Sequence, residues 1–253
     1  MTEMIQAALH AALSIGVILS VPQSDRTPRW IAGVLWVSAC MGGAYLSRSF
    51  AGAALGWASA LAPFLTEGVF GRSIGLRGAV SLVLFPAQSR LAATFERGPL
   101  LPLSLLLNGH LGALVAARLL ASLPPDMAAV SRPWLLGLAV LVAGWSAASA
   151  FLESRPRRVF ARLMAGQGAL ILAGLVCGND AGAAGALALW QAAAVASTML
   201  ACVYAGMEAR LGPALDRPGF LGLAAGAPRL AVFFAVAAFA LGDLPLTLGF
   251  PAA

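Results

Sequence analysis

The stretch AGALALWQAAAVASTMLACVYAG, residues 184–206, decides the fold class of this chain. An α-helix needs about 20 apolar residues to cross a hydrocarbon core roughly 30 Å thick, and this run meets that length without one charged side chain. It also lacks the alternation of apolar and polar residues that marks a strand of a membrane barrel. The stretch therefore predicts a transmembrane α-helix.

Comparable apolar runs recur along the whole chain of 253 residues, which is 60% hydrophobic and 10% charged. A soluble domain carries about 25% charged residues, so the composition indicates an integral membrane protein. We expect one all-α, polytopic membrane domain over residues 1–253. The predicted spans are 4–21, 29–46, 50–69, 99–122, 133–152, 159–177, 184–206 and 221–242.

All sixteen basic residues are arginines, and their distribution predicts a topology. Residues 76–95 carry Pro86 and Arg90 in their middle, so this segment is either a ninth, distorted span or one that does not cross. With eight spans, most loop arginines fall on one side and only Arg48 and Arg132 lie opposite, which fits the positive-inside rule. Both versions place the loop from Arg155 to Arg158 in the cytoplasm of a bacterium, the chain in the inner membrane, and the C-terminal tail outside.

The residue types that carry enzymatic chemistry are few and scattered. Cys40, Cys177 and Cys202 are far apart, and no pair of cysteines or neighbouring histidine indicates a metal site or a disulfide framework. No catalytic constellation can be assembled, so we expect no cofactor and assign any enzymatic activity to a partner chain. The net charge of +6 belongs to loops between spans, and we expect no nucleic-acid partner.

Several short motifs follow one another in a familiar order from residue 50 onward. Phe85-Pro86-Ala87-Gln88-Ser89-Arg90-Leu91 is similar to a Phe-Pro-x-His-Ser-x-Leu stretch, and Pro102-Leu103-Ser104 to the Pro-Val-Ser opening of a broken helix. Arg157-Arg158, followed by Ala161, is similar to a Lys-Arg-x-x-Ala loop. Through these motifs, residues 50–253 resemble the antiporter-like membrane subunits of respiratory complex I, membrane-bound hydrogenases and Mrp-type cation/proton antiporters. Residues 1–49 form divergent N-terminal spans.

The departures from that family concern the proton path. Its members move protons through a buried glutamate paired with a lysine, followed by further lysines or histidines. In this chain Ala58 stands where the resemblance places the glutamate, and there is no lysine at all. The nearest counterpart of the broken-helix lysine is His110, and the preceding Asn108 and Gly109 predict a local distortion of the helix. The resemblance thus implies a helical frame whose proton path is largely erased.

Four residues are candidates for any remaining proton path, and each has an alternative role. Imidazole exchanges protons near neutral pH, so His110 either relays protons or forms a hydrogen bond to a neighbouring helix. Glu67 lies near a span end and either carries protons or extends to the membrane surface. Asp243 either coordinates an ion or lies in a solvated turn, and Gln167 either holds water or bonds another helix. Arg118, near a span end, is expected to bond a backbone carbonyl or extend to the surface.

Three functions remain open. The first is a shortened, largely non-conducting scaffold or docking subunit of a larger membrane complex, with Arg155, Arg157 and Arg158 setting topology or docking. The second is a subunit that conducts protons or cations through His110 and ordered water, coupled to redox or CO2-hydration chemistry in a partner. The third is a small independent solute transporter with a central cavity. The expected partners are other membrane subunits, the lipid bilayer and a peripheral catalytic subunit.

Overall fold

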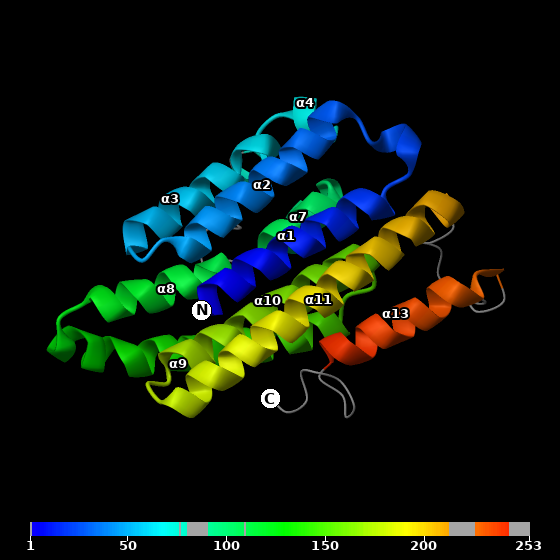
Figure 1. Cartoon of the computed structure of the whole chain (residues 1–253). Coiled ribbons are helices and arrows are strands. Elements are labelled where there is room, and N and C mark those ends of the chain that lie inside the picture. Colours follow the sequence, from blue (N-terminus) through cyan, green and yellow to red (C-terminus); the bar gives the residue numbers. More distant parts are fainter. Residues whose placement is uncertain (1, 76, 80–90, 109, 213–225, 243–253) are drawn as a thin grey trace.

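The computed structural model describes residues 2–75, 77–79, 91–108, 110–212 and 226–242. Within these ranges the chain is all-helical and forms no strand, as the sequence predicts. Most helices run alongside one another as an elongated bundle (Figure 1). Residues 85–90 of the Phe-Pro motif and Asp243 lie outside the described residues.

The described helices begin and end as follows. They are α1 (Thr2–Ser20), α2 (Pro28–Leu46), α3 (Phe50–Ala60), α4 (Glu67–Phe70), α6 (Leu91–Arg97), α7 (Leu100–Asn108), α8 (Leu111–Ser122), α9 (Pro125–Phe151), α10 (Pro156–Val176), α11 (Asp180–Leu211) and α13 (Pro228–Leu241), with short 3-10 turns at Gln23–Asp25 and Ala62–Phe64.

Proline and polar caps define where many helices start. Pro28, Pro125, Pro156 and Pro228 each occupy the first turn of a helix, where the missing N–H has no intrahelical partner to lose. Asn179 caps α11 because its Oδ1 accepts a hydrogen bond of 2.7 Å from the Gly182 amide. These local signals determine the residue at which each of these helices begins.

Among the described residues, five helical stretches are long and apolar enough to cross a membrane: Glu3–Ser20, Leu100–Ser122, Pro125–Phe151, Pro156–Val176 and Asp180–Leu211. The larger number of eight or nine spans is not confirmed. The predicted span 50–69 forms the 11-residue α3, a 3-10 turn and the short α4, because Pro63 in the turn has no amide hydrogen to continue a helix. Helix α13, with 14 residues, is also shorter than a full span.

The start predicted at residue 133 needs correction. Helix α9 begins at Pro125 and continues through Pro133. A single proline is tolerated inside a membrane helix when neighbouring groups take over the freed backbone carbonyl, so Pro133 did not mark a boundary.

The helices follow one another in a definite order across the bundle. Figure 1 shows α2 and α3 along one edge, α1 and α7 in the middle, and α10 and α11 beyond them, with α13 flanking α11. Glycines allow close approach between neighbouring helices: a methyl group on Gly56 would lie 2.9 Å from the Cys40 carbonyl oxygen, and one on Gly174 would lie 2.8 Å from that of Gly182. Small residues permit this packing where lipid supplies no hydrophobic drive for association.

Candidate functional site

The span from Leu100 to Ser122 is interrupted in its middle. Helix α7 ends at Asn108 and α8 starts at Leu111, so the distortion predicted from Asn108 and Gly109 is present. Between the two helices His110 has φ of +40°, the one positive φ of a non-glycine residue in the described part of the chain. A left-handed conformation costs an L-residue about 1–2 kcal/mol, so packing around this break must hold it in place.

Asn108 supplies much of that packing through hydrogen bonds to α11. Its side chain is 1% exposed. The Asn108 amide nitrogen donates to the Thr198 hydroxyl and, at 3.3 Å, to the Ala194 carbonyl oxygen. The Ser197 hydroxyl donates to Asn108 Oδ1 at 2.6 Å. We call Asn108, Ser197 and Thr198 the amide-hydroxyl cluster; it is uncharged and ties the break to α11.

Trp190 adds a fourth link between the break and α11. Its indole Nε1 donates to the Asn108 carbonyl oxygen at 3.2 Å, satisfying a carbonyl at the end of α7. The Trp190 ring also meets the His110 ring edge-on, with the two centroids 6.2 Å apart. The break is therefore held from one side by a single helix.

His110 is buried beside a small cavity. The residue is 8% exposed, and its Nε2 has no hydrogen-bond partner among the described residues. On the α10 side the ring packs tightly, since a methyl group on Gly168 would lie 3.2 Å from His110 Nδ1. The cavity has a volume of about 40 Å3. Its wall comprises Trp57, Leu91, Leu106, Leu107, His110, Leu111, Gly112, Ala113, Met164, Ala165 and Gly168.

The two other predicted proton-path residues that the structure describes do not gather around His110. Glu67 is exposed at the start of α4. Gln167 donates a hydrogen bond of 2.8 Å to the Leu241 carbonyl oxygen and so connects α10 with the end of α13. Asp243 lies outside the described residues. Of the three candidates that the structure describes, His110 alone is placed at the helix break.

The three loop arginines that the sequence marks for topology or docking form ion pairs at one end of the bundle. The Arg157 guanidinium binds the Glu208 carboxylate through two hydrogen bonds of 2.6 Å, and it also donates to the Gly98 carbonyl oxygen at 3.0 Å. Arg155 and Arg158 both pair with Glu96. These contacts join the start of α10 to the end of α11 and to the α6–α7 connection.

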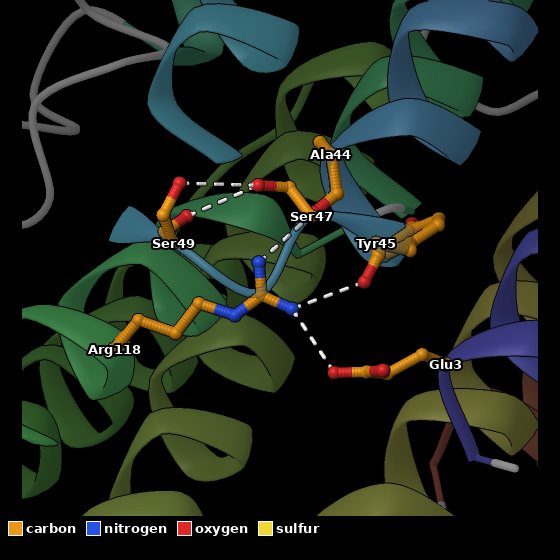
Figure 2. A network of polar contacts seen from close by, with 6 residues as sticks. All are labelled: Glu3, Ala44, Tyr45, Ser47, Ser49 and Arg118. Atoms are coloured by element: carbon orange, nitrogen blue, oxygen red, sulfur yellow. Dashed lines mark hydrogen bonds and ion pairs between the residues drawn. The ribbon is translucent and has the colours of Figure 1, made fainter. Parts of the chain in front are cut away.

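A second arginine network lies where α1 begins and α2 and α8 end (Figure 2). The Arg118 guanidinium donates to the Ala44 and Tyr45 carbonyl oxygens, at 3.0 Å each, and lies 3.3 Å from a Glu3 carboxylate oxygen. The expected bond from Arg118 to a backbone carbonyl is confirmed. Arg118 thereby holds the start of α1 against the end of α2.

Sequence reasoning missed a polar stripe on α1. Gln6, His10 and Ser14 are 5%, 3% and 1% exposed, and they recur every fourth residue, so they share one buried helix face. The Ser14 hydroxyl donates to the His10 carbonyl oxygen at 2.9 Å. The His10 ring contacts the Tyr45 ring edge-on, with centroids 6.0 Å apart. The spacing of these three residues in an otherwise apolar span was the signal that could have revealed the stripe.

Comparisons with known proteins find no matching protein-family model and no matching curated protein.

Proposed function

We propose that this chain is an integral membrane subunit of a larger proton- or cation-translocating assembly, and that it contributes a helical frame and docking surface while conducting little itself. The resemblance to antiporter-like subunits supplies the class of assembly. In such a subunit, the cytoplasmic end of the frame is marked by Arg155, Arg157 and Arg158.

The amide-hydroxyl cluster is the observation that carries the proposal. In the resembled conducting subunits, protons pass through a series of titratable groups. Here His110 is the one titratable residue at the break, and the side chains that join the break to α11 are the neutral ones of Asn108, Ser197 and Thr198. Ion pairs among the described residues, such as Arg157 with Glu208 and Arg118 with Glu3, lie near helix ends instead. Charge in these pairs therefore serves to join helices near their ends.

Purification from native membrane in mild detergent tests membership of an assembly. We expect the chain to co-purify in fixed stoichiometry with membrane subunits that retain the buried lysines and glutamates of the resembled family. A redox or CO2-hydrating peripheral subunit in the same preparation would identify the kind of complex. Isolation of the chain as a monomer or a homo-oligomer, without such subunits, would refute the proposal.

A second candidate function, proton conduction through His110 and water, rests on the cavity beside this residue. Its volume of about 40 Å3 exceeds the roughly 30 Å3 that one water molecule occupies in the liquid, and His110 Nε2 has no partner among the described side chains. A water molecule in the cavity would supply that nitrogen with a hydrogen bond.

Proton flux measured in the reconstituted assembly separates the two functions. His110→Asn removes the imidazole but retains a residue type that tolerates positive φ, so the break keeps its backbone geometry. Unchanged flux with normal subunit stoichiometry supports the frame. Loss of flux in an intact assembly supports conduction through His110. Gly168→Ala, which crowds the same ring without removing it, is the matched variant.

A further inference from the structure

The stripe on α1 contains two buried polar groups that lack partners. The side-chain nitrogen of Gln6 and the Nε2 of His10 are each enclosed, and neither has a hydrogen bond to any described residue. Both residues lie in the candidate span Glu3–Ser20. A buried, unpaired donor or acceptor costs about 1–3 kcal/mol, and hydrocarbon offers no relief. Two such groups, one helical turn apart on the same helix face, point to a polar ligand that both could bind.

We propose that Gln6 and His10 form a water-binding site on the buried face of α1. The Gln6 amide nitrogen is a donor, while the His10 Nε2 is a donor or an acceptor according to the tautomer. Water matches both, because it donates and accepts. Residues four apart on a helix have Cβ atoms about 5–6 Å apart, a separation that one or two bridging water molecules span.

Water reaches this site from the end of the bundle at Glu3. Glu3 precedes Gln6 by three residues and His10 by seven, so the three side chains share one helix face. The Glu3 side chain is 50% exposed and lies 3.3 Å from the Arg118 guanidinium (Figure 2). The polar groups thus continue from the bundle end to His10, one helical turn at a time.

Aromatic rings separate this site from the cavity at His110. The His10 ring contacts Tyr45, the Tyr45 ring contacts Trp190 at a centroid distance of 5.7 Å, and Trp190 contacts His110. The two histidines are therefore the outer members of a series of four rings. The site at His10 is distinct from the break and goes beyond the proposed function, because a subunit that carries no flux can hold this water equally well.

Selective labelling offers a direct test, because the chain has only two histidines. We would incorporate 15N-histidine, reconstitute the protein in lipid nanodiscs and record water-edited solid-state NMR spectra. His110→Asn removes one imidazole and so assigns the other signal to His10. We expect rapid transfer of magnetisation from water to the His10 imidazole nitrogens in this variant and in the unmodified chain.

Removal of Gln6 tests whether the two residues share the water. Gln6→Leu should lower the water transfer to His10 severalfold, whereas Gln23→Leu, which alters an exposed glutamine outside the stripe, should leave it unchanged. An unaltered His110 resonance shows that each variant has folded. Absence of water transfer to His10 in the unmodified chain, or equal transfer with and without Gln6, would overturn the proposal.

Discussion

Asn108→Leu removes the amide-hydroxyl cluster without changing the size of the side chain greatly, and its cost can be worked from the structure. Hydrogen bonds between helices in a membrane contribute about 0.6 kcal/mol each on average, with a maximum near 1.7 kcal/mol. Asn108 exchanges three with α11 through its side chain. We therefore expect the free energy of unfolding to fall by about 2 kcal/mol.

The expected loss of unfolding free energy is no larger than this, because the partners of Asn108 have other acceptors for their hydrogens. In the variant, the Thr198 hydroxyl still donates to the Ala194 carbonyl oxygen at 2.8 Å, and the Ser197 hydroxyl turns its single hydrogen from Asn108 Oδ1 to the Ala193 carbonyl oxygen. Neither is left as an unsatisfied buried donor, so the usual penalty for a broken pair does not apply. The loss comes from the connection between helices alone.

Reversible unfolding in mixed detergent micelles measures the cost, and a double-mutant cycle isolates the pair. Ser197→Ala combined with Asn108→Leu should show a coupling energy of about 0.6 kcal/mol. Ser149→Ala removes a hydroxyl that bonds only within α9 in the described structure, and it should leave the stability unchanged. An Asn108→Leu variant with the same free energy of unfolding as the unmodified chain, or zero coupling energy with Ser197→Ala, would refute the view that this cluster holds the break.

Three further predictions concern other contacts. Arg157→Lys should destabilise the fold by about 1–2 kcal/mol in thermal unfolding, because an ammonium cannot reproduce the two-bond contact with Glu208. A loss no greater than that caused by an Arg→Lys substitution at an exposed arginine would contradict this. His110→Gly should raise the unfolding free energy by up to about 1 kcal/mol relative to His110→Ala, since glycine adopts positive φ freely, and equal stabilities would show that the break is unstrained. Gly56→Leu should cost about 1–3 kcal/mol or more in the same assay by forcing α2 and α3 apart, and wild-type stability would show that they do not pack closely.

Properties that depend on solvent and chain length were predictable from sequence. The thickness of the hydrocarbon core sets the length of an apolar helix, so residues 184–206 fall inside α11. The shorter helices were misjudged, because apolar composition does not show where a 3-10 turn replaces a helix. In residues 50–69, apolar residues continue across the turn that ends α3, and the helix-ending effect of Pro63 in that turn was missed.

The contacts at the site depend on tertiary structure and were only partly predictable. Asn108 and Gly109 predicted a distorted helix. Ser197 is 89 positions from Asn108 in the sequence, however, and no local pattern predicts that these two residues are in contact. For α1, the spacing of Gln6 and His10 defines a common face, yet which way that face points is decided by α2 and α11 packing against it. Sequence periodicity shows which residues share a helix face, whereas tertiary packing decides whether that face points into the bundle or outward.

The interruption between α7 and α8 also divides an electric dipole. In one continuous helix the partial charges of successive peptides cancel along the axis, whereas a break exposes the negative end of α7 beside the positive end of α8 near the middle of the span. The indole of Trp190 neutralises part of the negative end by donating to the Asn108 carbonyl oxygen. Opposite partial charges therefore face each other across His110, an environment that favours small dipolar guests over bare ions of either sign.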